Sequence, residues 1–225
     1  MKCTKLKSLS SLLVVAVSCL LVHRIEAAEE KWMSLFNGKD LTGWKANLYP
    51  DSFKVVDGTI RAQATTASSH LFFVGTGKPE EARFKNFELK LMARGETNAN
   101  SGVFIHTDTS TRDASHHLAK GYEIQLNSTE KEKRKTGSLY AIVDLAKSPV
   151  DESKWFEVYI RVEGKRIQVK INGQTTADYT EPTNPERPPE RKGRLLDTQG
   201  GSIALQGHDP GSVFYFKEIM VRRLP

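Results

Sequence analysis

An alternation of apolar and polar residues with a period of two runs from Phe53 to Val221 and limits the folds open to this 225-residue chain. A β-strand turns successive side chains to opposite faces, so this period predicts strands with one apolar face. No stretch shows the period of an amphipathic helix. Strands or hairpins are expected at residues 53–62, 70–74, 84–94, 100–106, 121–126, 137–143, 156–171, 202–208 and 213–221.

Turn dipeptides separate these stretches. Asn37-Gly38, Asp57-Gly58 and Asn172-Gly173 suit tight turns, and Asp57-Gly58 closes the first expected hairpin. The longer hairpin at 156–171 turns at residues 163–165. Short strands joined by turns over this length predict an all-β fold, a two-sheet antiparallel sandwich.

The N-terminal residues have the pattern of a secretory signal peptide. Three lysines lie among the first seven residues, an apolar run follows from Leu12 to Val22, and Ala27-Ala28 offer a cleavage site. The apolar run is too short to span a bilayer. We expect a signal peptide at residues 1–27, a single domain at residues 28–225, and a secreted or periplasmic protein. Lipid attachment at Cys19 is the alternative.

Composition excludes several classes of function. Both cysteines, Cys3 and Cys19, lie in the leader, so the mature chain has no disulfide and no thiol nucleophile. Without residues 1–27, 29 Lys and Arg face 26 Asp and Glu, and the net charge falls from +6 to +3. That balance does not indicate a nucleic-acid partner. No glycine-rich phosphate loop is present, which argues against nucleotide binding.

The stretch from Gly121 to Leu126 is the strongest candidate for part of a site. Its alternation places Tyr122, Ile124 and Leu126 on one face and Glu123 and Gln125 on the other. The carboxylate and the amide are therefore about 7 Å apart along one strand face. A solvated sheet face would show the same pattern, so the neighbouring motifs must decide between the two readings.

Five motifs follow one another along the chain: FNGKDLTGW at 36–44, NSGVFI at 100–105, GYEIQ at 121–125, TGSLY at 136–140 and LQGH at 205–208. No single motif is specific, but their common order is. Together they resemble the 3-keto-disaccharide hydrolase family over about residues 32–224. The resemblance implies a concanavalin A-like jelly-roll sandwich whose concave sheet holds a carbohydrate site.

The resemblance also implies a reaction. A ketone at sugar C3 acidifies the C2 proton, so a base can remove that proton and expel the C1 oxygen by β-elimination, and water then adds to the enone. Such a site needs a base, an acid for the leaving group and donors for the enolate oxygen. Glu123 is the expected base or acid and His208 its partner. The residues expected to bind the keto oxygen and hydroxyls are Gln125, Tyr140, Gln206, His106 and Arg94.

Two residues depart from the family pattern. Many members have Arg at the position of His106 and Glu near Met92. Both positions are expected on the concave face, so the substrate detail, and activity itself, stay open. Direct displacement by paired carboxylates is less attractive, because no second acid lies clearly on the face of Glu123.

A metal site and non-enzymatic functions were also considered. His116 and His117 with Asp108 and Asp113 could suggest a metal, but adjacent residues on a strand point opposite ways, so no metal or other cofactor is expected. Calcium on loop oxygens such as Asp108 or Asp209 is conceivable in this fold. A non-catalytic carbohydrate-binding domain, or an interaction domain of the cell envelope, remains an alternative. The sugar, the linkage and the oligomeric state are open.

Overall fold

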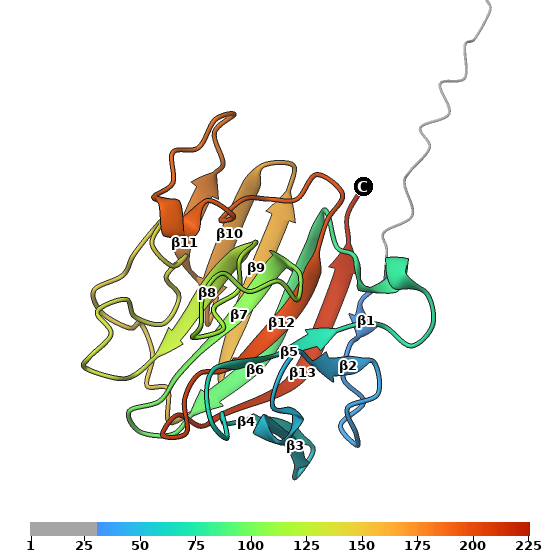
Figure 1. Cartoon of the computed structure of the whole chain (residues 1–225), viewed down its shortest axis with the longest axis vertical. Coiled ribbons are helices and arrows are strands. Elements are labelled where there is room, and N and C mark those ends of the chain that lie inside the picture. The colour runs from blue at the N-terminus through green and yellow to red at the C-terminus, as the bar shows by residue number, and fades with distance from the viewer. Residues whose placement is uncertain (1–30) are drawn as a thin grey trace, which may run out of the picture.

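The computed structural model describes residues 31–225, and two antiparallel sheets lie one against the other (Figure 1). The expected signal peptide and Cys19 fall outside these residues. The larger sheet has the order β11-β10-β9-β6-β13-β4-β3, with β1 paired to β13. Its strands are β1 (Met33–Ser34), β3 (Phe53–Val56), β4 (Thr59–Ala62), β6 (Phe87–Gly95), β9 (Phe156–Glu163), β10 (Arg166–Ile171), β11 (Gln174–Thr180) and β13 (Phe214–Arg223).

The smaller sheet has the order β2-β5-β12-β7-β8 and carries most of the expected site residues. Short 3₁₀ helices, η1 (Pro50–Ser52), η2 (Pro79–Ala82) and η3 (Pro189–Arg191), are the helical segments of residues 31–225. The all-β sandwich is therefore confirmed. The five strands are β2 (Trp44–Ala46), β5 (Ser69–Phe73), β7 (Asn100–Thr107), β8 (Tyr122–Asn127) and β12 (Ser202–Gly207).

One hydrophobic core fills the space between the sheets. Ile124 on β8 and Val158 and Ile160 on β9 are fully buried in it. The side chains alternate along each strand, so every second residue faces this core and the others face outward. Removal of this apolar surface from water is the main stabilising contribution to the fold. The alternation within 121–126 thus sends Tyr122, Ile124 and Leu126 inward, as expected.

The outer face of the smaller sheet carries a second apolar cluster. Phe72 on β5, Phe104 on β7 and Ala204 on β12 form it, and Leu118 from the loop between β7 and β8 packs on them. Long loops at residues 108–121, 128–155 and 181–201 connect the strands. The 108–121 loop lies over this face, because its residue Leu118 belongs to the cluster that β5, β7 and β12 supply.

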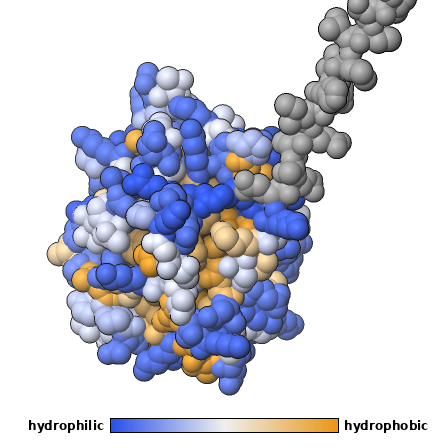
Figure 2. All heavy atoms as spheres, turned by 90° about the vertical axis from the view of Figure 1, so that its right-hand side faces the viewer, coloured by the Kyte–Doolittle hydropathy of each residue, from blue (hydrophilic) through white to orange (hydrophobic). Residues whose placement is uncertain are grey.

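Polar side chains cover most of the side of the molecule seen in Figure 2, with apolar atoms between them. The exposed large apolar side chains of residues 31–225 are spread over four separate stretches of the chain: Met33, Val56, Val74 and Leu195. Apolar residues exposed singly are normal at protein surfaces. This distribution does not by itself indicate a docking surface.

Two stretches differ from the sequence-based expectation. Residues 137–143 form turns with isolated bridges from Leu139 to Ile124 and Val143, because Gly137 and Ala141 adopt positive φ angles of 89° and 60°. Strand β11 has an almost wholly polar sequence with one buried apolar residue, Ala177, so its alternation was too weak to predict it.

Gly121, immediately before β8, fixes the start of the site strand. Its φ is +80°, and a Cβ atom there would lie 2.2 Å from the carbonyl oxygen of Ile105. Gly164 also has positive φ, +57°, but nothing lies within 4 Å of its Cβ position. Substitution of either glycine would strain the backbone, but only substitution of Gly121 would also cause steric overlap.

We predict that Gly121→Ala destabilises the protein far more than Gly164→Ala. Both variants place alanine in the left-handed region, which costs roughly 1–2 kcal/mol. Only Gly121→Ala also displaces the backbone of β7, which adds to that loss. Urea unfolding of both variants measures the free energies. Equal losses for the two would show that the close approach at Gly121 does not constrain β8.

Candidate active site

Five of the seven expected site residues line one pocket on the outer face of the smaller sheet. They are Glu123 and Gln125 from β8, Gln206 from β12, His208 just after β12, and Tyr140 from the 128–155 loop. The free volume is about 50 Å³. Other lining residues come from β7 and from the loops that cross this face, and they include Asn100, Phe104, Arg112, His117, Leu118 and Arg194.

Strand pairing places the carboxylate and makes room for it. In the β7–β8 ladder, Phe104 lies opposite Glu123 and Gly102 lies opposite Gln125. A Cβ atom on Gly102 would lie 3.0 Å from Glu123 Oε1, which is tighter than ordinary contact. The glycine therefore leaves the space into which the Glu123 side chain folds.

Glu123 forms a buried ion pair with Arg194, a residue that the sequence reading did not single out. Arg194 Nη2 lies 2.9 Å from Glu123 Oε2. Arg194 is 4% exposed and Glu123 is 7% exposed. Charges this deeply buried are stabilised when they are paired. No local signal marks Arg194, because it lies in an irregular Pro- and Arg-rich loop without periodicity.

His208 is oriented by a carboxylate and an amide. Its Nδ1 lies 2.7 Å from Asp209 Oδ2, and its Nε2 lies 3.2 Å from Asn100 Nδ2. Gln125 Nε2 donates to Asn100 Oδ1 at 3.1 Å. When Nδ1–H donates to Asp209, Nε2 keeps its lone pair and accepts from Asn100 Nδ2.

Asp209 is held in its ionised form. Burial alone would raise the pKa of this carboxyl, but hydrogen bonds from His208 and Ser212 outweigh burial and bring the pKa below its ordinary value. Ser212 Oγ donates to Asp209 at 2.7 Å and accepts from the backbone N–H of Asn100 at 2.9 Å. A closed ring of hydrogen bonds thus fixes the imidazole.

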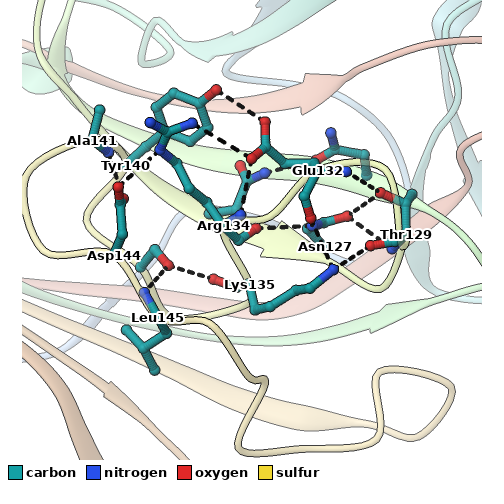
Figure 3. A network of polar contacts seen from close by, with 12 residues as sticks. Asn127, Thr129, Glu132, Arg134, Lys135, Tyr140, Ala141, Asp144 and Leu145 are labelled. Atoms are coloured by element: carbon teal, nitrogen blue, oxygen red, sulfur yellow. Dashed lines mark hydrogen bonds and ion pairs between the residues drawn. The ribbon is translucent and has the colours of Figure 1, made fainter.

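A hydrogen-bonded loop supports Tyr140 (Figure 3). The Tyr140 hydroxyl donates to Glu132 Oε2 at 3.1 Å, and the Arg134 guanidinium carbon lies 4.6 Å from the ring centre. Arg134 Nε bonds Asp144 at 2.9 Å. Asn127 Nδ2 donates to the carbonyls of Glu132 and Arg134. Burial, together with the charges of Glu132 and Glu123, raises the pKa of Tyr140, so its hydroxyl keeps its proton.

Several buried polar atoms around the pocket have no hydrogen-bond partner among residues 31–225. They are Gln125 Oε1, Gln206 Oε1, Arg194 Nε and Nη1, and His70 Nδ1. Buried polar groups in folded proteins are almost always hydrogen-bonded, and an unpaired one costs about 1–3 kcal/mol. The set combines acceptors and donors, as required to bind a ligand rich in hydroxyl groups.

His106 was expected beside these residues, but the structure turns it away. The β7–β12 register shifts between Ser202 and Ala204, and His106 has a φ of +52°. This bulge breaks the alternation that placed His106 on the face of Phe104. Its Nε2 bonds the Lys85 carbonyl at 2.9 Å, its Nδ1 accepts from the Asp197 N–H at 3.1 Å, and its ring stacks on Phe87.

Arg94 and Met92 were also expected on this face and lie instead on β6, in the other sheet. The Arg94 guanidinium carbon lies 4.6 Å from the Tyr215 ring centre and 5.5 Å from that of Trp155. Alternation correctly separates the two faces of this strand, but it does not tell which sheet the strand joins. The expected positions of Arg94 and Met92 were therefore wrong.

The paired histidines form a surface contact. His117 Nδ1 lies 2.8 Å from Asp113 Oδ2, and the ring of His116 lies 6.1 Å from that of Tyr49. Within residues 31–225, no group of three His, Cys, Asp or Glu side chains is arranged to hold a metal ion. The same residues contain no helix long and apolar enough to cross a membrane.

His70 on β5 lies beneath the pocket, fully buried. Its Nε2 is 3.4 Å from Gln206 Nε2, and its ring meets the Phe104 ring edge-on at 5.0 Å. Burial, followed by the charges of His117, His208 and Arg194, lowers the pKa of His70 to about 3. The folded protein therefore holds His70 neutral.

We predict that His70 makes the protein sensitive to acid. The unfolded chain takes up a proton near pH 6.5 and the folded chain only near pH 3, so this contribution is complete above pH 6.5 and is lost as pH falls toward 3. The slope reaches about 1.4 kcal/mol per pH unit. Urea unfolding at a series of pH values should show a shallower dependence for His70→Gln. An unchanged slope would contradict a neutral buried imidazole.

Comparison with solved structures places the sandwich among known folds. A protein from Parabacteroides distasonis that carries the provisional name glycosyl hydrolase is 21% identical, with a TM-score of 0.69, over 86% of this chain and 94% of that one. The carbohydrate-binding module CBM66 from Bacillus subtilis is 12% identical, with a TM-score of 0.54, over 81% and 97%. Identities this low show the shared fold alone.

The exoplasmic/lumenal domain of VIP36, solved with Ca²⁺ and Man3GlcNAc, is 9% identical, with a TM-score of 0.55, over 81% of this chain and 84% of that one. No curated protein sequence matches this chain. A family profile, that of the 3-keto-alpha-glucoside-1,2-lyase-like domain, matches residues 31–222. This match covers most of the chain, which therefore belongs to the family of 3-keto-alpha-glucoside-1,2-lyase-like domains.

Proposed function

We propose that this protein is an exported carbohydrate-active enzyme that cleaves the glycosidic bond of 3-keto-glycosides in the pocket around Glu123. The observation that carries the proposal is the convergence of three features. The pocket contains a carboxylate with one oxygen free of protein hydrogen bonds among residues 31–225, an oriented imidazole, and unpartnered buried donors and acceptors. Membership of the lyase-like family supports the choice of a keto sugar.

The first step is removal of the C2 proton. Arg194 Nη2 holds Glu123 Oε2, while Oε1 is left to act as the base. The C2–H electrons form the C1=C2 double bond, in conjugation with the C3 ketone. The C1–O bond breaks, and its electron pair leaves with the glycosidic oxygen. His208 in its protonated form gives that oxygen a proton from Nε2.

Hydration completes the cycle. Neutral His208 takes a proton from water as the hydroxyl adds to C1, and Glu123 returns its proton to C2. Both groups regain their starting state, and the net reaction is hydrolysis. The Asn100 and Gln125 amides can serve both forms of His208, because turning both amides over presents Asn100 Oδ1 to Nε2–H and Gln125 Oε1 to Asn100 Nδ2. The glycosidic oxygen takes the place of Asn100 Oδ1 as the acceptor of Nε2–H when the proton is transferred.

A sugar requires more space than the pocket offers in this conformation. The free volume of the pocket is about 50 Å³, whereas ordinary ligand pockets begin at roughly 300 Å³. The side chains of His117 and Leu118, from the loop across the sheet, line it. Substrate entry would therefore displace that loop, as in other enzymes with closing loops.

A non-catalytic carbohydrate-binding domain is the second candidate. It is favoured by the fold shared with CBM66 and with the VIP36 domain solved with an oligosaccharide. The two candidates differ in what Glu123 does, since a binding domain needs its hydrogen bonds but not its basicity.

We predict that Glu123→Gln lowers kcat on a 3-keto-glucoside by about 10²–10⁴-fold, the usual range for a positioned acid–base group. The amide keeps an acceptor for Arg194, so the variant should fold and bind substrate. Glu157→Gln, on β9 of the other sheet, is the matched control and should keep full activity. The rate is measured from the release of the leaving group over time.

Several outcomes would contradict the proposal. Turnover by Glu123→Gln within a few-fold of the parent would remove Glu123 from the reaction. Sugar binding by the parent protein without any turnover would favour the binding domain. Cleavage of the unoxidised glycoside at the same rate as its 3-keto form would exclude the elimination chemistry.

A further inference from the structure

Arg194 presents an unused edge of its guanidinium group beside Glu123. Nη2 donates to Glu123 Oε2, while Nε and Nη1 are buried and have no partner among residues 31–225. A guanidinium group has five N–H donors in a rigid plane. Nη2 is therefore engaged by the carboxylate, and Nη1, which shares the tip of the guanidinium group with Nη2, is left for an oxygen atom of a ligand.

The loop backbone fixes this side chain in place. A Cβ atom on Gly193 would lie 1.9 Å from the Ala119 carbonyl oxygen, so the two loops meet with no side chain between them. The Gly121 N–H donates to the Gly193 carbonyl at 2.9 Å, and Arg187 Nε donates to the Arg194 carbonyl at 3.0 Å. Arg194 is held against the start of β8, one strand position from Glu123.

A partly buried network holds Arg187 in turn. Its Nη2 lies 3.0 Å from the Tyr122 hydroxyl and 2.7 Å from the Tyr179 hydroxyl. Tyr122 donates to Glu181 at 2.6 Å, and Glu181 also accepts from the Leu196 N–H at 2.8 Å. The loop is thus fastened on both sides of Arg194, which indicates a preorganised group.

The surroundings of the guanidinium strengthen its interaction with charge. Its central carbon lies 5.7 Å from the Phe104 ring centre and 5.8 Å from the Tyr140 ring centre. Walls of this kind exclude water, and fixed charges act more strongly where water is excluded.

Proton transfer to Glu123 moves negative charge from its carboxylate to the C3 oxygen of the sugar, and Arg194 can contact both groups. When Glu123 accepts the C2 proton, its carboxylate becomes neutral and the C3 oxygen becomes an enolate. The total charge does not change, but it passes from Oε1 and Oε2 to the sugar. A guanidinium that contacts both groups keeps a negative partner at every stage, so neither it nor the enolate is left buried and unpaired.

We propose that Arg194 is a further catalytic residue, whose Nη1 binds the C3 oxygen of the substrate as ketone and as enolate. This assignment rests on the proposed function. From the sequence, the residues expected to bind the keto oxygen and hydroxyls were Gln125, Tyr140, Gln206, His106 and Arg94. The Tyr140 hydroxyl proton is engaged by Glu132, and His106 and Arg94 lie outside the pocket.

Arg194→Lys is the most direct test, because lysine keeps the positive charge beside Glu123 and lacks the planar edge. We expect kcat on a 3-keto-glucoside to fall about 10²–10³-fold, as on removal of one oxyanion donor, with the melting temperature little changed. Arg166→Lys is the matched control. Its guanidinium also pairs with a carboxylate, Asp178, but on the far sheet. This control should keep full activity.

A binding measurement extends the test to protein that does not turn over. In the Glu123→Gln background, affinities for a 3-keto-glucoside and its unoxidised parent are measured by calorimetry, with and without Arg194→Gln. The double variant has no buried charge left at the pair, so it should fold even if Arg194→Lys does not. We expect Arg194→Gln to remove about a ten- to hundredfold preference for the keto sugar, the range for a charged hydrogen bond.

The outcomes separate the two proposals. Turnover by Arg194→Lys within a few-fold of the parent overturns the role of Arg194 and leaves the proposed function intact. Absence of turnover in the parent, with a keto preference that depends on Arg194, rejects the proposed function and keeps Arg194 as the ligand of the C3 oxygen. Absence of both turnover and keto preference overturns both.

Discussion

The buried ion pair between Glu123 and Arg194 is the interaction on which the candidate site depends. It joins β8, whose alternation is set by the core, to the 181–201 loop, which has no regular structure around Arg194. Two charges that are each less than a tenth exposed are stable together and costly apart. The pair therefore fixes the loop over the sheet and holds Glu123 Oε2 in place.

Strands β7 and β12 of the smaller sheet supply other residues of the site on its outer face. Strand β7 supplies Gly102, which leaves room for the carboxylate, and Phe104, which walls the pocket. The end of β12 brings His208 into the same pocket, and Asp209 orients its ring. Three crossing loops cover these strands. The smaller sheet closes the core with its inner face, and its outer face carries both the polar site residues and the small apolar cluster of Phe72, Phe104, Leu118 and Ala204.

Sequence alone predicted those parts of the molecule that depend on local alternation. The inward and outward faces of 121–126 follow directly from its period of two, and so does the sandwich. The position of Arg94 could not be predicted, because alternation does not identify the sheet that a strand joins. The predicted position of His106 was wrong for another reason, because a bulge in β7 reverses the sheet face to which the side chain points. Arg194 left no signal, because its position is set by contacts of its loop with Ala119 and Tyr122.

In the proposed reaction, bond cleavage begins with removal of the C2 proton. A 3-keto-glucoside carrying deuterium at C2 tests this step through the ratio of kcat/KM for the protiated and deuterated substrates. We expect a primary isotope effect well above one, together with a transient enone absorbance. A ratio of one, with the enone absent at full turnover, would mean that C1 is attacked directly and would exclude elimination.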